Sequence, residues 1–472
     1  MTTRPGYPSY LGERDGELTV LGRSSRELVA EFGSPLFVFA EPRIAANVDE
    51  IRRAYASAFP RLSIMYASKA CANLAVLDVV RRTGCGVEVN SGGELYKALR
   101  AGFPASDIVF NGVSKSVSEL EDAVRAGIRS INVDSIAELQ RISTVAASLD
   151  RPANVTLRVV PSVLGGTVTG FETGHGGSKF GMLISELDAA AAELGRHERL
   201  RFHGFHFHVG SQVTRADAFA EGLRVVLEAA VEFHARTGLV PESINMGGGF
   251  PIPLVPDREV PTHRDGTRLA SKIERLLLGS LSLPEVAAAT RAVWDEVAGA
   301  VFSADTTDVL IEPGRRVIGD AGILLTQIES RKTRPGTPAL EWLLIDTGFN
   351  LVPEALWYDW YYHIVSASRR ADPHGAAFRI GGPLCDTGDS QHDERGTGKL
   401  PDTRWLPSTT DVGDLLAFLC TGAYAFEQQN NYNGRPKAPA VMIREGGETV
   451  AIARRETNAD LIARDLVLPT EP

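Results

Sequence analysis

Lys69 is the first residue of this sequence whose type and position suggest chemistry. It lies in the stretch MYASKAC, Met65 to Cys71, which runs from an apolar segment into small residues. An ammonium group that leaves water is costly, so a lysine at the end of a buried strand needs a route to solvent, a partner or a covalent use. Reaching solvent is the common case, whereas a primary amine in a binding site can form an imine with a carbonyl compound.

Further polar and glycine-rich positions follow other short apolar runs. These positions are Glu88, Arg158, His206, His208, Ser211, Gly247, Gly248, Gly249, Glu312 and Arg315. Three glycines after a strand can direct backbone N–H groups at a phosphate, although such a run is more often only a tight turn. A reactive lysine, a phosphate cradle, a carboxylate and a flat imidazole in one pocket would suit pyridoxal phosphate. His206, inside its predicted strand, is interpreted as a core histidine.

The elements that must position these residues alternate between short β-type runs and longer helical periods. Eight strands are predicted at LSIMYA, GVEV, DIVFNG, SINVD, NVTLRVV, FHGFHFHVG, SINMGG and DVLIEPG, with amphipathic segments between them. Eight strand–helix units in about 250 residues are typical of a (β/α)₈ barrel of the TIM type. We expect this barrel at 41–315, with the polar positions gathered at the carboxyl ends of its strands.

The rest of the chain is predicted to form a mostly antiparallel β domain. After residue 315, alternating runs such as EWLLIDTG and DLLAFLCTGAY are separated by turn residues, which is typical of antiparallel strands. Residues 1–40 are expected to contribute strands, so the β domain would comprise 1–40 and 316–472. An insertion at 251–301 is first rich in proline and charge and then helical, and the sequence does not define its role.

Composition limits the classes of partner. The chain has 472 residues, of which 43% are hydrophobic, and a formal net charge of −10. Nucleic acids and anionic membranes attract basic patches, so neither partner is expected. The N-terminus lacks a leader pattern and no apolar run could span a bilayer, which favours a cytoplasmic enzyme. The four cysteines have no paired spacing of the zinc or redox kind, and no metal site is predicted.

The ordered motifs YASKA, SGGEL, HVGSQ, GGGFP, EPGR, GPLCDTGD and GAYAF…NYNGRP resemble those of the fold-type III pyridoxal-phosphate decarboxylases. This group contains diaminopimelate decarboxylase and eukaryotic-type ornithine decarboxylase. The resemblance covers nearly the full chain. It implies an alanine racemase-like subunit with a barrel and a β domain, a homodimer with active sites at its interface, and decarboxylation of an amino acid.

The resemblance also implies a role for each matching residue. Lys69 would hold the aldehyde of pyridoxal phosphate, Glu312 would keep its pyridine nitrogen protonated, and His208 would lie against the ring. The other cofactor-binding positions implied are Glu88, Arg158, Ser211, Gly247, Gly248, Gly249, Arg315 and Tyr424. In some family members the arginine matching Arg315 lies near the phosphate, and in others it faces a substrate carboxylate.

Cys385, in the motif GPLCDTGD, would return a proton to Cα after carbon dioxide leaves. The resemblance implies that Cys385 and Asp386 act in the neighbouring subunit's site. Racemisation, as in alanine racemase, is an alternative in the same fold, but no tyrosine motif for a second base is evident. A catalytically silent regulatory homologue is a further alternative, against which the presence of Lys69, Glu312 and Cys385 argues.

The stretch GFNLVPEALWYDWYYH bears on the substrate. Diaminopimelate decarboxylases carry an arginine in an RPxLY-type stretch, whereas the equivalent region of this chain has Val352, Pro353 and Glu354 and no arginine. Neutral and acidic side chains cannot bind a carboxylate in the bidentate way. The stretch resembles that of ornithine decarboxylase, in which Asp359 would accept a distal ammonium with help from Asp386. A solvated loop acid is the alternative interpretation of Asp359. We therefore predict a basic substrate such as ornithine or lysine, D or L, with meso-diaminopimelate as the alternative.

Overall fold

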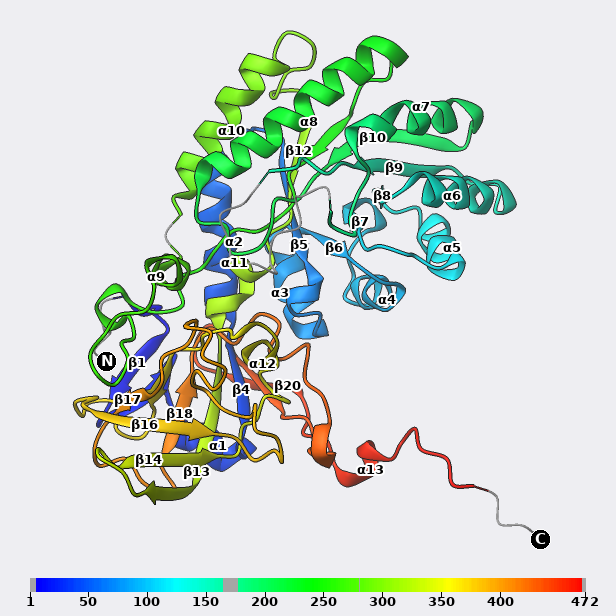
Figure 1. The fold of residues 1–472 in the computed structure, drawn as a ribbon. Helices are drawn as coiled ribbons and strands as arrows, with labels where there is room; N and C mark the ends of the chain where they lie inside the picture. The colour runs from blue at the N-terminus through cyan, green and yellow to red at the C-terminus, as the bar shows by residue number, and fades with distance from the viewer. Residues whose placement is uncertain (1–5, 164–176, 280, 469–472) are drawn as a thin grey trace. The chain divides into compact units, whose positions relative to one another are not determined.

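The computed structural model describes residues 6–163, 177–279 and 281–468. They fold into two compact units (Figure 1). The barrel unit comprises Ile44–Pro253 and Gly279–Ile318, and the β unit comprises the described residues of Met1–Arg43, Leu254–Leu278 and Gly319–Pro472. The segment 254–278, which the sequence-based division places within the barrel, is thus part of the β unit.

Eight parallel strands close into a barrel. They are β5 (Leu62–Ala67), β6 (Gly86–Val89), β7 (Ile108–Phe110), β8 (Ser130–Val133), β9 (Ala153–Arg158), β10 (Leu200–His206), β11 (Ser243–Asn245) and β12 (Asp308–Ile311). Each strand pairs with the next along the chain, and β12 pairs with β5 to complete the closure. The predicted (β/α)₈ barrel is confirmed.

Helices follow the strands and surround the barrel (Figure 1). They are α2 (Glu41–Tyr55), α3 (Leu74–Arg82), α4 (Gly92–Arg100), α5 (Val117–Ala126), α6 (Ile136–Ser148), α7 (Leu187–Arg196), α8 (Ala216–Thr237) and α10 (Leu283–Val297). Four of them begin with the same device, a serine side chain that accepts the backbone N–H of a glutamate three residues on: Ser91 for α4, Ser116 for α5, Ser135 for α6 and Ser282 for α10. Such caps stabilise a helix start, so α4, α5 and α6 begin soon after β6, β7 and β8.

Apolar packing fills the middle of the barrel. Met65, Val109 and Leu310, from three different strands, form a buried cluster. A Cβ atom on Gly86 would lie 2.6 Å from the Met65 side chain, so β6 starts with the one residue that leaves room for it. The interior is therefore a packed core and not a pore, which leaves the carboxyl ends of the strands for polar side chains.

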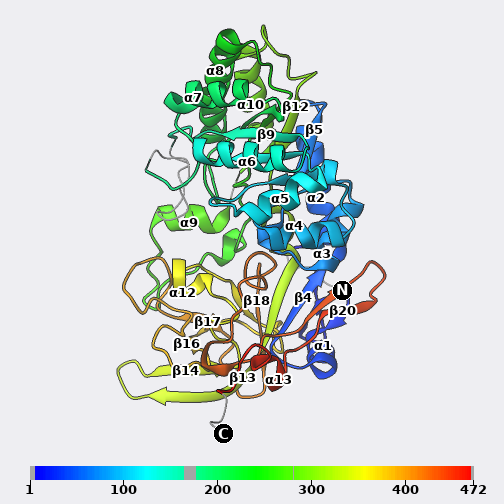
Figure 2. The same cartoon turned by 90° about the vertical axis from the view of Figure 1, so that its right-hand side faces the viewer.

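The β unit is built on a nine-stranded sheet. Its strands are β4 (Leu36–Ala40), β13 (Gly322–Arg334), β14 (Leu340–Ile345), β15 (Ile364–Ser366), β16 (Ala376–Gly381), β17 (Arg404–Leu406), β18 (Leu415–Phe418), β19 (Ala440–Ile443) and β20 (Thr449–Ala453). Figure 2 shows the long strand β13 beside β4. Only the pairs β14–β16 and β4–β19 are parallel within this sheet, so the predicted, mostly antiparallel β domain is confirmed. The N-terminal region contributes β4, as expected.

Smaller elements complete the two units. A separate sheet of β1 (Leu11–Arg14), β2 (Glu17–Val20) and β3 (Arg23–Ser24) leads into α1 (Ser25–Phe32), and the remaining helices are α9 (Ser271–Leu278), α11 (Arg315–Ile318), α12 (Glu354–Tyr358) and α13 (Asn458–Leu461). Within the described residues no single helix is long and apolar enough to cross a membrane.

Candidate active site

The barrel strands carry a ring of polar side chains at or near their carboxyl ends. In order from β5 to β12 these are Lys69, Glu88, Asn111, Asn132, Arg158, His206, Asn245 and Glu312. All except Lys69 are buried. Because the carboxyl ends of barrel strands meet at one mouth, eight separate segments deliver these groups to the same place.

Lys69 lies in a short 3₁₀ turn, Ser68–Ala70, directly after β5. Its side chain is 44% exposed, although Ser68 and Ala70 on either side are buried, and its Nζ atom lies 3.8 Å from Glu88 Oε1. The amine is thus accessible to a ligand, small side chains flank it, and a carboxylate lies beside it. This is the setting that the predicted covalent use of the lysine requires.

Glu88 and Glu312 share one amide donor. Asn111 Nδ2 donates to Glu88 Oε1 at 2.8 Å and to Glu312 Oε2 at 2.9 Å. Burial raises the pKa of Glu88 to about 7, against the attraction of Lys69 and with the support of the neighbouring Glu312 charge. Glu88 therefore holds or releases its proton near neutral pH.

Glu312 has the opposite tendency. It also accepts from Asn245 Nδ2 at 2.7 Å and lies 3.3 Å from His206 Nε2. Burial alone would raise the pKa of Glu312, but His206, Lys69 and the Asn245 amide outweigh it and keep the pKa well below the usual range. The two neighbouring carboxyl groups therefore differ in pKa: Glu312 is ionised, and Glu88 can carry a proton.

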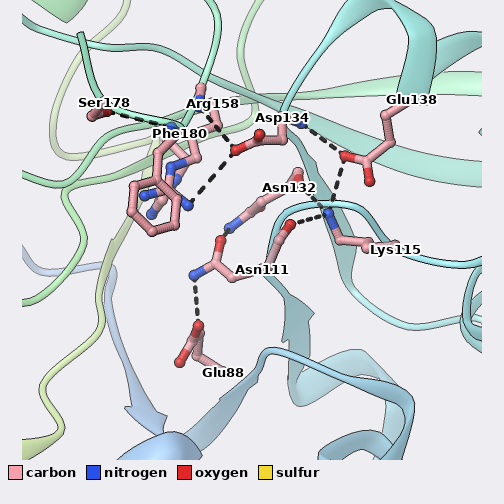
Figure 3. Close-up of polar contacts among 12 residues, drawn as sticks. Glu88, Asn111, Lys115, Asn132, Asp134, Glu138, Arg158, Ser178 and Phe180 are labelled. Carbon is pink, nitrogen blue, oxygen red and sulfur yellow. Dashed lines mark hydrogen bonds and ion pairs between the residues drawn. The ribbon is translucent and has the colours of Figure 1, made fainter. Parts of the chain in front are cut away.

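A buried chain of side chains fixes the direction of the shared amide (Figure 3). Asn132 Nδ2 donates to Asn111 Oδ1 at 2.6 Å, so the NH₂ group of Asn111 must face the carboxylates. Lys115 Nζ in turn donates to the Asn132 backbone oxygen at 2.9 Å and to Glu138 at 3.1 Å. The Lys115 and Glu138 side chains are each 1% exposed, so this ion pair anchors the ends of β7 and β8.

Arg158 lies beside this chain (Figure 3). Its guanidinium carbon is 4.5 Å from the ring centre of Phe180, and its Nη1 atom is 3.9 Å from Asp134. Burial lowers the pKa of Arg158, while Asp134 and Glu312 raise it. Arg158 thus adds a second cation to the polar ring, beside Lys69.

The glycine turn after β11 approaches its neighbours too closely for any side chain. A Cβ atom on Gly248 would lie 2.1 Å from the backbone oxygen of Glu312, and one on Gly249 would lie 2.2 Å from that of Gly210. The turns after β10 and β11 are also joined by a bond from the Val213 N–H to the Gly249 carbonyl at 2.9 Å. This close approach brings Ser211 next to the turn and leaves a backbone-lined cradle of the kind that phosphates occupy.

Two amides of this cradle already have partners. The Gly248 N–H donates to His208 Nδ1 at 3.1 Å, and the Gly247 N–H donates to Asn245 Oδ1 at 2.9 Å. The ring of His208, just beyond the end of β10, is therefore held by the turn, and burial keeps its pKa well below the usual range, assisted by Lys69 and Arg158. A phosphate in the cradle would have to share these donors, a detail that the sequence prediction did not contain.

Arg315 begins α11 and is buried. A Cβ atom on the preceding Gly314 would lie within 3.2 Å of the Cβ atoms of Ala67 and Ala70, so this loop packs on the turn that carries Lys69. The positions predicted from the barrel sequence all belong to the barrel unit, and their contact with the cofactor stays a prediction. Among the described residues no group of three or more His, Cys, Asp or Glu side chains could hold a metal ion.

The other predicted site residues lie in the β unit. Cys385 is an exposed free thiol, and its backbone N–H donates to Asn433 Oδ1 at 2.6 Å. Tyr432 Oη lies 3.4 Å from Asp386 Oδ2, so the motifs GPLCDTGD and NYNGRP form one loop cluster. Tyr424 is half-buried in a turn with φ of +67°. Whether these residues face the cofactor stays a prediction.

Asp359 has cationic neighbours that the sequence did not reveal. Its carboxylate forms ion pairs with Arg395 and with Lys399, the latter at 3.7 Å, and only 11% of its side chain is exposed. Arg395 also donates to the Leu356 backbone oxygen at 2.7 Å. The loop therefore presents both signs of charge and not a lone carboxylate.

Three ring residues escaped the sequence analysis, namely Asn111, Asn132 and Asn245. The available signal was weak: each is an uncharged polar residue close to the end of a short apolar run. His206 was interpreted as a core histidine; it is buried, and it also contacts Glu312. Its role is to hold a carboxylate and not only to fill space.

We expect Asn111→Leu to lower kcat/KM by about tenfold to a hundredfold, because two buried carboxylates lose a charge-assisted hydrogen bond. Loss of the amide should also raise the pKa of Glu88 further above 7 and shift the pH–rate profile to higher pH. Asn132→Leu, which removes a side chain that touches neither carboxylate, should have a smaller effect. Equal effects of the two substitutions on the pH profile would contradict this assignment.

Comparisons with known proteins agree with this geometry. A family model described as "Pyridoxal-dependent decarboxylase, pyridoxal binding domain" matches residues 45–319. Diaminopimelate decarboxylase of Methanocaldococcus jannaschii is 34% identical over 466 residues, covering 97% of this chain and 96% of that protein, and the Aquifex aeolicus enzyme is 32% identical over 456 residues, covering 97% of each. The crystal structure of the M. jannaschii enzyme in co-complex with L-lysine has a TM-score of 0.83 at 32% identity, covering 97% of this chain and 98% of that one. The sequence-based prediction of family and cofactor is confirmed: the chain belongs to the pyridoxal-phosphate-dependent decarboxylases, enzymes that remove a carboxylate from an amino acid.

Proposed function

We propose that this enzyme decarboxylates meso-diaminopimelate to lysine and carbon dioxide. The observation that carries the proposal is the polar ring at the barrel mouth, where an accessible Lys69 amine stands beside one ionised and one titrating carboxylate. The relatives support this substrate, because diaminopimelate decarboxylases match this chain over 97% of its length.

Pyridoxal phosphate, when bound, supplies a ring that accepts the electron pair left by the departing carboxylate. Lys69 would hold its aldehyde, and the ionised Glu312 would keep the pyridine nitrogen protonated. The residues that would complete its binding site are Gly247, Gly248, Gly249, Ser211, Arg158, Arg315, Glu88, His208 and Tyr424. Glu88, Arg158, Glu312 and Arg315 are buried, which strengthens the interactions of their charges.

The thiol of Cys385 would deliver a proton to Cα after carbon dioxide leaves. Its exposed position within the β unit leaves the Sγ atom accessible, and the bond from its backbone N–H to Asn433 holds the loop in place. A thiol held by its own main chain can present its proton to one face of the substrate. This stereochemical role is part of the proposal.

The charges around Asp359 support a zwitterionic distal end in the substrate. Diaminopimelate carries both an ammonium and a carboxylate there, and Asp359 together with Arg395 and Lys399 offers a partner for each. Arg395 would bind the distal carboxylate in place of the arginine that the stretch around Val352 lacks. All of these residues belong to the β unit.

Lysine or ornithine is the second candidate. The observation that favours it is the stretch Val352–Glu354, which has no arginine where the resemblance implies the carboxylate-binding arginine of diaminopimelate decarboxylases. A substrate with a distal ammonium alone would then displace Arg395 from Asp359. The two candidates therefore assign opposite roles to Arg395.

The test offers the purified holoenzyme meso-diaminopimelate and both enantiomers of lysine and ornithine, and measures carbon dioxide release. We expect meso-diaminopimelate to have the highest kcat/KM and Arg395→Gln to lower it about tenfold or more. A higher kcat/KM for lysine or ornithine, left unchanged or improved by Arg395→Gln, would establish the second candidate instead.

We also propose that the enzyme is a cytoplasmic homodimer and that the β unit completes the partner's active site, as predicted for the domain at 1–40 and 316–472. All four cysteines are free thiols, as a reducing compartment favours. If Cys385 acts across the interface, a mixture of Lys69→Ala and Cys385→Ala subunits should regain about a quarter of wild-type activity, since half of the dimers hold one whole site of two.

The matched control for this mixture is Lys69→Ala with Glu312→Gln. Both of these substitutions lie in the barrel unit, so no combination of the two subunits contains a whole site. Recovery in the control, or none in the Lys69 and Cys385 mixture despite subunit exchange, would contradict action of Cys385 across the interface.

A further inference from the structure

Lys115 is a buried lysine that takes no direct part in the proposed reaction. It lies in the barrel unit between β7 and α5, and it forms an ion pair with Glu138 at the same depth. A buried ion pair often adds no net stability, because both partners lose the hydration that they have in the unfolded chain. The pair therefore needs another explanation, and Figure 3 shows the chain of contacts that leads from Lys115 to Glu88.

All three N–H donors of the Lys115 ammonium have acceptors, which belong to three parts of the barrel unit. The Nζ atom donates to the Gly112 backbone oxygen at 2.8 Å, to the Asn132 backbone oxygen at 2.9 Å and to Glu138 Oε2 at 3.1 Å. Gly112 directly follows Asn111 after β7, whereas the other two acceptors lie in β8 and in α6. An ammonium held in three directions ties the loop after β7 to β8 and α6.

The two segments that Lys115 joins carry the amides that reach the carboxylates. Asn132 Nδ2 donates to Asn111 Oδ1 at 2.6 Å. Asn111 Nδ2 then donates to Glu88 at 2.8 Å and to Glu312 at 2.9 Å. Because a hydrogen bond weakens steeply when its angle departs from linear, the position of the Asn111 backbone decides whether one amide can bind two carboxylates.

We propose that Lys115 is a positioning residue for the reaction, which holds the Asn111 amide where it can donate to both buried carboxylates. Glu138 supports it, since its Oε2 atom balances the Lys115 charge and also accepts from the Asp134 N–H at 2.8 Å. This role rests on the function proposed above, because decarboxylation is the reaction that it serves. Lys115 itself touches neither the substrate nor the cofactor in this role.

The proton of Glu88 should report the position of the amide. The hydrogen bond from Asn111 lowers the pKa of Glu88, against the burial that raises it to about 7. The charged groups that act on Glu88 or on Lys115 are Lys69, Glu94, Glu312, Glu138, Asp134 and Arg158. Loss of Lys115 removes a positive charge as well as a contact, so a test has to separate charge from position.

The experiment compares Lys115→Met with the double variant Lys115→Met/Glu138→Gln as holoenzymes. The double variant removes one positive and one negative charge together, and the glutamine oxygen can still accept from the Asp134 N–H. It leaves no buried ion unpaired, so it should fold even if the single variant does not. The melting temperature, the pH dependence of kcat/KM and the pH dependence of the cofactor absorption without substrate are measured for each protein.

We expect the double variant to lower kcat/KM for meso-diaminopimelate about threefold to thirtyfold. The midpoint of the pH-dependent change in absorption should move upward by about half to one pH unit, because the bond from Asn111 to Glu88 is weakened. The matched control is Arg129→Met/Asp308→Asn, which removes an ion pair of 2.6 Å at the opposite ends of β8 and β12. This control should leave the midpoint and kcat/KM unchanged.

The absorption measurement needs no substrate, so it distinguishes this role from the proposed function. A shifted midpoint in an enzyme that does not decarboxylate meso-diaminopimelate would support the role of Lys115 and refute that substrate. A wild-type midpoint in the double variant overturns the role, whether the melting temperature falls or not, because position then has no effect on Glu88. Loss of the fold in the double variant also overturns it, since the pair would then serve stability.

Discussion

Replacing Lys69 by alanine is expected to lower kcat by at least about a thousandfold, with the fold intact. The lysine is the one exposed member of the polar ring, so its removal leaves no buried cavity in the core. The loss has two causes: the cofactor's aldehyde loses its covalent partner, and Glu88 loses its nearest cation. The purified variant should lose the yellow colour of bound cofactor, or retain it only weakly, in an absorption measurement.

Two further measurements separate this effect from general damage. Lys332→Ala, at an exposed position of β13, should keep wild-type activity and colour. Circular dichroism of Lys69→Ala should give the wild-type spectrum. A Lys69→Ala enzyme with more than about a tenth of wild-type kcat would remove this residue from the chemistry.

Glu312→Gln is expected to lower kcat by about a hundredfold to a thousandfold, in the range measured when a preorganised electrostatic contact is removed from an active site. Glutamine has nearly the same shape as glutamate but no charge, so a protonated pyridine nitrogen would lose its counter-ion. Its NH₂ group would also face one of the two amide donors, Asn111 or Asn245, that now point at the carboxylate. The cofactor absorption spectrum and its pH dependence should change together with kcat.

Glu312→Asp provides the informative comparison, because it keeps the charge and shortens its reach. We expect it to retain more activity than Glu312→Gln, while Glu228→Gln, at an exposed position of α8, should be silent. Similar losses for Asp and Gln at position 312 would show that geometry, and not charge, is what this side chain contributes.

Much of the fold could be predicted because the barrel repeats one local pattern. Each short apolar run became a strand, and capping serines at positions 91, 116 and 135 fixed where the next helix begins. The assignment of segment 254–278 could not be predicted, since it depends on contacts far along the chain. Examples are the contact of Glu259 with His363 and the bond from Trp405 to the Thr262 backbone oxygen.

The charged groups of the site were predictable and their partners were not. Lys69, Glu88 and Glu312 stand out because a charge at the end of an apolar run needs a reason. Asn111 carries no charge, and its importance appears only when the barrel closes and two distant carboxylates meet at its amide. In the same way Arg395 reaches Asp359 from 36 residues along the chain, a pairing that no local pattern encodes.

The most direct test of the account is to find which lysine carries the cofactor. The holoenzyme is reduced with borohydride, digested, and analysed by mass spectrometry for peptides that carry the reduced cofactor. We expect a single modified peptide containing Lys69, and no label in the Lys69→Ala enzyme. A stable adduct on any other lysine, or no adduct in a protein that has bound pyridoxal phosphate, would contradict the assignment of the active site to the carboxyl end of the barrel.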